Sequence, residues 1–139
     1  MRPARDEDRE LFFVTRRDGF RRYVEANKPW DDGEQRASAN ADFDALPVEI
    51  IERGGVAIGY QIVEHNDDHW RLDEIALVAP ERNRGIGTDL VRAIMASARA
   101  AGMPLRLNCL RANPARRLYD RLGFRVIAEE DVRVRMEWP

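Results

Sequence analysis

A strand–turn–helix segment in the middle of this chain constrains its fold and chemistry more than any other feature. An apolar run ends at Val78, Pro80 breaks it, and an Arg-Asn-Arg-Gly-Ile-Gly turn over 82–87 leads directly into a helix predicted over 85–101. Glycines let the main chain of such a turn approach a ligand and point its N–H groups at one place. The helix N-terminus behind them favours a bound anion, and the two arginines add positive charge. The segment therefore predicts an anion site, most simply for a diphosphate.

The spacing of this turn disfavours two common nucleotide sites. A P-loop needs a lysine directly after its second glycine, and this turn contains no lysine. A dinucleotide fingerprint needs a third glycine at position 90, which is Leu90. A Gly-x-Gly pair alone also fits a plain tight turn. The order strand, Val-x-Pro, Arg-x-x-Gly-x-Gly, helix is a much more specific combination.

Hydrophobic periodicity divides the rest of the chain into alternating helices and strands. Helices are predicted over 6–27, 34–43, 85–101 and 114–122. Strands are predicted over 48–52, 56–64, 70–78, 105–110, 124–128 and 132–138, and residues 1–5 could supply only a short first strand. This order indicates an α/β (α+β) fold with a mixed sheet. No repeat, low-complexity tract or linker marks a boundary, so we expect a single domain over 1–139.

The balance of charges limits the classes of partner. The chain carries 23 basic and 25 acidic residues, a formal net charge of −2, and Lys28 is its only lysine. Bulk binding of nucleic acid needs many clustered, uncompensated cations, so we expect no nucleic-acid partner. No apolar run reaches the ~20 residues of a membrane span, and the first residues lack the apolar region of a signal peptide. We therefore expect a cytoplasmic protein with no membrane segment.

The few cysteine and histidine residues do not suggest a metal site. Cys109 is the only cysteine, so it has no partner for an internal disulfide, and its alternation with Leu105 and Leu107 is typical of a small core residue. His65 and His69 flank a stretch of Asn and Asp, which turns commonly contain. We therefore expect no metal.

Two segments together resemble the GCN5-related N-acetyltransferase (GNAT) superfamily. Arg82, Gly85 and Gly87 match its acetyl-CoA-binding signature, Arg/Gln-x-x-Gly-x-Gly/Ala. The stretch from Asn113 to Phe124 resembles a later motif of the family, Asn…Leu-Tyr-x-x-x-Gly-Phe. The resemblance implies a mixed, mostly antiparallel sheet of six to seven strands with four helices, in the order β-α-α-β-β-β-α-β-α-β-β. The first strand would be short or missing here.

The resemblance also implies an acyltransferase activity. A member of this family is an N-acetyltransferase that moves the acetyl group of acetyl-CoA, a co-substrate, to a primary amine by direct attack through a tetrahedral intermediate. A main-chain N–H at the end of the strand before the turn would polarise the acetyl carbonyl. The resemblance assigns cofactor binding to Leu77, Val78, Arg82, Asn83, Arg84, Gly85, Ile86, Gly87, Thr88, Asn113 and Arg116.

Two residues are candidates for proton transfer. Tyr119 matches the usual general acid of the family, and a phenol is protonated at neutral pH and can donate to a departing thiolate. Glu74, on the strand before the turn, could take the proton that an acceptor ammonium must lose, directly or through water. Structural roles stay open beside these: packing for Tyr119, an arginine partner for Glu74, and a helix cap for Asn113.

The acceptor amine is not specified by the sequence. The N-terminal helices form the acceptor side in this family, and their aromatic and acidic residues could attract a cationic amine or could be core residues and helix caps. A small-molecule amine and a peptide N-terminus both fit, and the family resemblance allows a homodimer. An alternative function is a catalytically inactive sensor or regulatory domain that binds acyl-CoA. The residues in question are Phe20, Tyr23, Trp30, Asp31, Asp32, Glu34, Asp42, Phe43 and Asp44.

Overall fold

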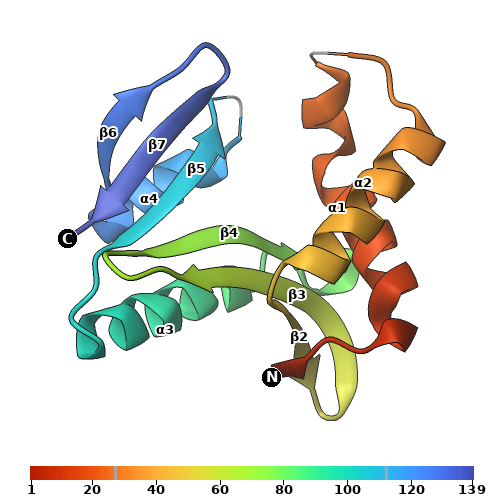
Figure 1. Ribbon diagram of the computed structural model, residues 1–139, viewed down its shortest axis with the longest axis horizontal. Helices are drawn as coiled ribbons and strands as arrows, with labels where there is room; N and C mark the ends of the chain where they lie inside the picture. The colour runs from red at the N-terminus through yellow and green to blue at the C-terminus, as the bar shows by residue number, and fades with distance from the viewer. Residues whose placement is uncertain (27, 112) are drawn as a thin grey trace. The chain divides into compact units, whose positions relative to one another are not determined.

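The computed structural model describes residues 1–26, 28–111 and 113–139, and the side chain of Tyr23 lies outside the described part. Its helices are α1 (Arg9–Glu25), α2 (Asp32–Ala45), α3 (Ile86–Ala100) and α4 (Ala115–Leu122), with 3-10 turns η1 (Asp6–Asp8) and η2 (Ala79–Glu81) (Figure 1). Its strands are β1 (Arg2–Pro3), β2 (Val48–Arg53), β3 (Val56–His65), β4 (Trp70–Leu77), β5 (Leu105–Leu110), β6 (Arg125–Glu129) and β7 (Arg133–Trp138).

The strands form one sheet in the order β1-β2-β3-β4-β5-β7-β6. The pairs β1–β2, β2–β3, β5–β7 and β6–β7 are antiparallel, and β4 runs parallel to β5. The predicted mixed, mostly antiparallel sheet and the predicted order of elements are confirmed. The first strand is present but short, and its Arg2 pairs with Ile50 of β2.

Predicted and observed boundaries differ at the two N-terminal helices for local reasons. The helix predicted over 6–27 starts as the turn η1 and becomes an α-helix only at Arg9. The helix predicted over 34–43 starts earlier, because Asp31 caps it: its carboxylate accepts a hydrogen bond from the Glu34 N–H at 3.0 Å. The end of the first prediction, Asn27, lies outside the described residues.

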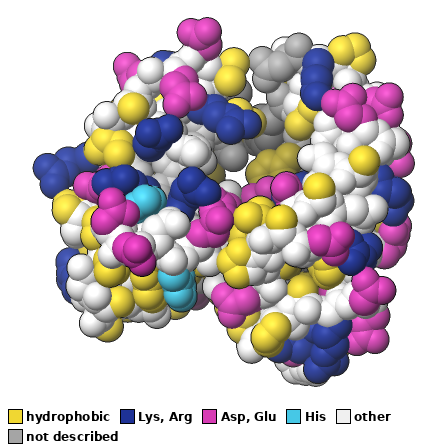
Figure 2. Space-filling model, in the orientation of Figure 1, with side chains coloured by type: hydrophobic (Ala, Val, Ile, Leu, Met, Phe, Trp, Pro, Cys, Tyr) yellow, Lys and Arg dark blue, Asp and Glu magenta, His cyan; other side chains and the backbone are white. Residues whose placement is uncertain are grey.

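The chain divides into two compact units, one of residues 1–62 with 74–84 and the other of residues 63–73 with 85–139. A single domain over 1–139 stays a prediction. In the described part of the chain, no helix combines the length and the apolar character needed to cross a bilayer. On the face shown in Figure 2, basic and acidic side chains are interspersed.

The first unit has an aromatic core between α1, α2 and the strands β2 and β3. Phe12 and Tyr60 are fully buried with their ring centroids 4.4 Å apart, and Phe43 of α2 meets Phe12 edge to face at 5.5 Å. Burying such rings contributes most of the packing energy of a small core. Aliphatic, small and aromatic residues complete the cluster: Phe13, Ala39, Val48, Ile50, Ile62 and Ala76.

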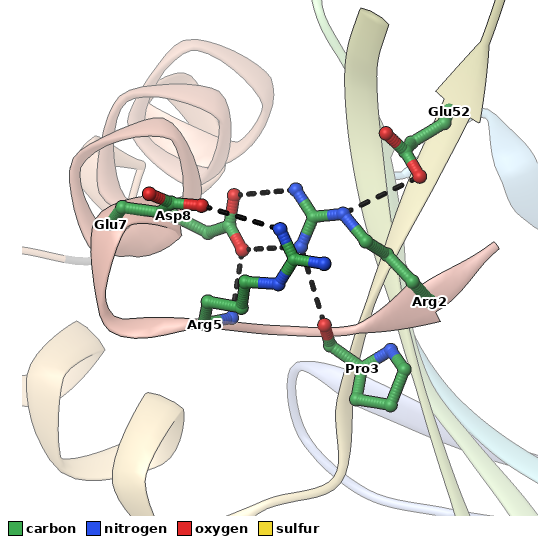
Figure 3. A network of polar contacts seen from close by, with 6 residues as sticks. All are labelled: Arg2, Pro3, Arg5, Glu7, Asp8 and Glu52. Carbon is green, nitrogen blue, oxygen red and sulfur yellow. Dashed lines mark hydrogen bonds and ion pairs between the residues drawn. The ribbon is translucent and has the colours of Figure 1, made fainter. Parts of the chain in front are cut away.

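A polar network fixes the N-terminus of the chain to this core (Figure 3). Arg2 of β1 donates two hydrogen bonds to the carboxylate of Asp8, at 2.7 and 3.0 Å, and its Nε lies 3.4 Å from Glu52 of β2. The Arg5 N–H donates to the same Asp8 carboxylate at 2.7 Å. The hydrogen bonds from Arg2, despite the burial of the carboxyl, lower the pKa of Asp8. These contacts hold a two-residue strand in place where its own ladder is too short to do so.

The second unit is built on β5. Leu105, Leu107 and Cys109 point to one side of this strand and are buried, as the alternation predicts. Figure 1 shows β5, β7 and β6 side by side, with α4 against β5. The helix α3 buries a continuous stripe at helical spacing, Val91, Ile94, Met95 and Ala98.

Candidate functional site

The turn after β4 is fastened to its own strand by Arg82. The Arg82 Nε donates to the Leu77 carbonyl at 2.9 Å, and its Nη2 is buried without a partner among the described residues. A Cβ built on Gly19 of α1 would lie 3.7 Å from that Nη2, so the guanidinium lies beside the helix where a side chain is missing. Arg82 thus already has a main-chain partner, although the sequence predicts contact with a diphosphate.

Arg84 is the more available cation of the turn. Its side chain is 55% exposed and lies 3.4 Å from Glu81, a carboxylate that also pairs with Arg53 at 2.7 Å. Such an exposed, shared ion pair contributes little and is easily exchanged for another anion. Asn83, before it, adopts a left-handed conformation with φ of 60°, which asparagine tolerates better than most residues.

The start of α3 has the geometry of an anion site. Gly85 precedes the helix with φ of 78°, a left-handed conformation that favours glycine. Within residues 1–26, 28–111 and 113–139, no side chain caps this helix. The first-turn N–H groups of Ile86, Gly87 and Thr88 have no acceptor within the helix. A Cβ built on Gly87 would meet nothing within 4 Å, so there is room for a ligand beside these donors.

The main chain at the end of β4 is partly engaged. The Val78 N–H donates to the Ile58 carbonyl at 2.9 Å, so this N–H is not free to polarise a ligand carbonyl. The Leu77 carbonyl accepts from Arg82. Of the two main-chain positions that the sequence suggests as donors to an acetyl carbonyl, Val78 already has its N–H engaged.

Glu74 is held by two neighbours in the first unit. The Arg16 guanidinium of α1 donates to its Oε1 at 2.6 Å and to its Oε2 at 3.3 Å, and the Tyr60 hydroxyl of β3 donates to Oε2 at 2.6 Å. The Glu74 side chain is still 24% exposed. The arginine partner that the sequence allows for Glu74 is therefore present, and the side chain is not fully buried.

Tyr119 lies on α4 in the second unit, with its ring edge to face against Phe124 at 5.7 Å. Burial, and to a smaller extent the neighbouring Cys109 thiol, raises the pKa of Tyr119 to about 12. The phenol therefore carries its proton throughout the physiological range. This is the protonation state that a proton donor needs.

Asn113 and Arg116 flank the start of α4. The Asn113 side-chain oxygen accepts a hydrogen bond from the Ala115 N–H at 2.9 Å. Asn113 therefore binds a main-chain donor at the start of α4, although the N-cap position itself is Pro114. Arg116 forms no ion pair with any acidic side chain in the described part of the chain. Its charge is therefore available to a phosphate group.

The acidic residues of the first unit that the sequence singles out have partners within the protein. Asp31 caps α2, Asp42 pairs with Arg16 at 3.0 Å, and Asp44 pairs with Arg9 at 2.6 Å. Glu34 pairs with Lys28, and Asp32 accepts from the Trp30 indole N–H at 3.3 Å. Phe20 and Phe43 pack against the core. These contacts favour core and capping roles for this set over a dedicated amine-binding surface.

The candidate residues fall into one group in each unit. Glu74, Leu77, Val78, Arg82, Asn83 and Arg84 belong to the first unit, and Gly85, Ile86, Gly87, Thr88, Asn113, Arg116 and Tyr119 belong to the second. Sequence reasoning missed Arg16 and Tyr60. They contact Glu74 across 58 and 14 residues of chain, and no local pattern marks such a pair. No described group of three or more His, Cys, Asp or Glu side chains could hold a metal ion.

A family model settles where this chain belongs. The model of the acetyltransferase (GNAT) family matches residues 5–124. The chain belongs to this family. It is accordingly an acyltransferase, as the sequence predicts. No curated protein sequence matches the chain.

Solved structures of other acetyltransferases share the fold. The PaiA N-acetyltransferase from Thermoplasma acidophilum, in complex with coenzyme A, is 16% identical with a TM-score of 0.74 over 94% of this chain and 92% of its own. An acetyltransferase from Thermus thermophilus is 14% identical, with a TM-score of 0.76 over 99% and 94%. An N-acetyltransferase from Staphylococcus aureus is 18% identical, with a TM-score of 0.71 over 99% and 98%. At these identities the likeness concerns the fold alone.

Proposed function

We propose that this GNAT protein transfers the acetyl group of acetyl-CoA to a primary amine. One observation supports the proposal most strongly: the uncapped start of α3, with Gly85 in a left-handed conformation and open space at Gly87. These features coincide with the acetyl-CoA signature of the family. A diphosphate would accept hydrogen bonds from the unpaired N–H groups at this helix start, and the dipole of α3 would favour its negative charge.

The cofactor-binding set comprises main-chain and side-chain groups. The N–H groups of Ile86, Gly87 and Thr88 bind the diphosphate. The exposed Arg84 and the half-buried Arg116 neutralise phosphate charge. Leu77 and Val78 offer main-chain groups to the pantetheine arm, with the Leu77 N–H as donor to the acetyl carbonyl. Arg82 shapes the turn through the Leu77 carbonyl. Asn83 and Gly85 contribute through their left-handed backbone conformations. Asn113 contributes through its hydrogen bond to the first turn of α4.

The proton transfers are assigned to two side chains. Acetyl-CoA supplies an acetyl group activated as a thioester. Glu74 accepts the proton that the acceptor ammonium loses, directly or through a water molecule. Tyr119 holds its proton at neutral pH and gives it to the sulfur that leaves. No metal takes part in this proposal.

The acceptor is proposed as a primary amine on a small molecule or a peptide N-terminus. A carboxylate base suits an amine acceptor, because the ammonium form must lose a proton before the amine can attack. The protein is proposed to act as a single cytoplasmic domain, as a monomer or homodimer, without a nucleic-acid or membrane partner.

The decisive experiment combines binding with turnover. Calorimetry of the full chain with acetyl-CoA, ATP and NAD should show binding of acetyl-CoA alone, and a panel of amines should release free CoA with at least one member. Preference for ATP or NAD would overturn the proposal. Tight acetyl-CoA binding without CoA release for any amine would favour the sensor or regulatory role instead.

A further inference from the structure

We infer that Arg16 and Tyr60 are positioning residues that fix the Glu74 carboxylate for its part in acetyl transfer. This inference rests on the proposed function, because Glu74 is the proposed base. It adds two residues that lie outside every motif of the family discussed above.

The geometry places donors on both oxygens of Glu74. Arg16 reaches Oε1 at 2.6 Å and Oε2 at 3.3 Å, and Tyr60 reaches Oε2 at 2.6 Å. Paired donors of this kind fix both the position and the plane of a carboxylate. The Glu74 side chain is 24% exposed, which lets an acceptor approach it from solvent.

Both donors are themselves rigidly held. The Arg16 side chain is only 14% exposed, its guanidinium lies 4.7 Å from the Phe12 ring centre, and its Nη1 donates to Asp42 of α2 at 3.0 Å. Tyr60 is fully buried. Contacts of this kind on several elements leave the carboxylate little freedom to rotate, which is what a proton acceptor of fixed geometry requires.

The charges around Glu74 keep both donors in their donating forms. Burial of Arg16 opposes its charge, but Glu74 and Tyr60 together more than offset this, and the pKa of Arg16 is raised. Burial and the Glu74 charge raise the pKa of Tyr60 well above its usual value, so its hydroxyl keeps its proton. Among the described residues, Arg16 from α1 and Tyr60 from β3 contact Glu74 directly, and Asp42 from α2 contacts Arg16.

A double-mutant cycle tests the inference, because it asks whether Arg16 acts through Glu74. The full chain is assayed with acetyl-CoA and its fastest amine as wild type, Glu74→Gln, Arg16→Gln, Tyr60→Phe, and as each of the last two combined with Glu74→Gln. We expect Arg16→Gln to lower kcat about tenfold or more, since small misplacements of a reacting group are costly. In the Glu74→Gln background it should lower kcat by less than about twofold. Tyr60→Phe should behave in the same way with a smaller loss, and KM for acetyl-CoA should not change.

Arg9 offers a matched control on the same helix. It also bridges to an acid of α2, Asp44 at 2.6 Å, and lies 4.6 Å from the centre of a phenylalanine ring, that of Phe43. Its described contacts do not include Glu74, so Arg9→Gln should change kcat by the same small factor in both backgrounds. If Arg16→Gln does not fold, Arg16→Lys replaces it in the cycle, because it keeps the charge and loses the paired donors.

The outcomes separate the inference from the proposed function. Equal losses from the Arg16 variant in the wild-type and Glu74→Gln backgrounds would overturn the inference, with acetyl transfer intact. A wild-type chain that releases no CoA with any amine would overturn the proposed function, and the inference with it. A loss confined to the background that contains Glu74, with an unaltered KM for acetyl-CoA, supports both.

Discussion

Arginine side chains in the first unit combine two contacts that lysine cannot make together. The guanidinium of Arg36 lies 4.0 Å from the centre of the Phe13 ring and pairs with Glu10 at 2.7 Å. Arg9 stacks on Phe43 while it pairs with Asp44, and Arg16 stacks on Phe12 while it pairs with Glu74. A planar guanidinium can present its face to a ring and its edge to a carboxylate. These three arginines are therefore structural parts of α1 and α2.

The proposed role of Tyr119 depends on one atom, its hydroxyl oxygen. Tyr119→Phe removes the hydroxyl and keeps the ring that packs against Phe124. We expect kcat to fall about a hundredfold, because a general acid contributes roughly 10²–10⁴-fold, while KM for acetyl-CoA stays within about twofold. Steady-state kinetics of CoA release measure both quantities.

The control for Tyr119 is the free energy of unfolding. A urea titration should show Tyr119→Phe close to wild type, since the ring contact is kept. Turnover equal to that of wild type would remove the hydroxyl from the mechanism and leave Tyr119 as a packing residue.

The segment from β4 to α3 leaves space for a ligand at its helix start. Gly87 sits in the first turn of α3 with open space where a Cβ would be. Gly87→Leu should weaken acetyl-CoA binding about tenfold or more by filling that space, measured by calorimetry. Its effect on stability should be small, because leucine has a higher helix propensity than glycine.

Gly87→Ala is the matched variant for this test. The family signature accepts alanine at this position, and a methyl group would meet no neighbour within 4 Å. We expect it to keep acetyl-CoA binding within about threefold and to raise the free energy of unfolding by about 0.5–1 kcal/mol, as glycine-to-alanine changes in helices do. Unchanged binding in Gly87→Leu would show that the ligand does not occupy this space.

Most elements can be predicted because their signals are local. The stripe of Val91, Ile94, Met95 and Ala98 fixes α3, and the alternation around Cys109 fixes β5. The predicted helix starts two residues after the observed start of α2. Hydrophobic periodicity gives no information about the hydrogen bond that the Asp31 cap accepts. The anion-binding start of α3 is predictable for the same reason as α3 itself: its turn, glycines and helix are adjacent in sequence.

At the scale of the whole molecule, the contacts that sequence reasoning misses join residues far apart in the chain. An arginine partner for Glu74 is one of the alternatives that the sequence allows, but nothing in its neighbourhood specifies Arg16, which is 58 residues away. The short β1 depends on contacts that join it to η1 and β2, from Arg2 to Asp8 and to Glu52.

A cluster of charged side chains on β3 and β4, in the second unit, couples folding to pH. Arg71 of β4 donates to Asp73 at 2.8 Å and also to Glu64 of β3. While Asp73 is ionised, one of its oxygens is buried without a hydrogen-bond partner among the described residues, and protonation lets this carboxyl donate to Glu64. Burial, together with the contact to Glu64, raises the pKa of Asp73 to about 7, whereas hydrogen bonding to Asp73 lowers the pKa of Glu64. The pair therefore holds one proton over much of the acidic range.

The direction of the resulting pH effect follows from proton binding. An unfolded aspartate releases its proton near pH ~4, but the folded chain keeps the proton on Asp73 until about pH 7. Because the folded state then binds more protons, this group lowers the free energy of unfolding as the pH rises from about 4 to about 7, and the effect levels off above pH 7.

Asp73→Asn imitates the protonated form, so it should stabilise the chain at pH 8 relative to wild type and do so less at pH 5. Urea unfolding at both pH values measures the difference, and Asp67→Asn on the exposed hairpin loop is the control that should not alter it. An equal effect of Asp73→Asn at pH 5 and pH 8 would mean that Asp73 does not keep its proton in the folded chain.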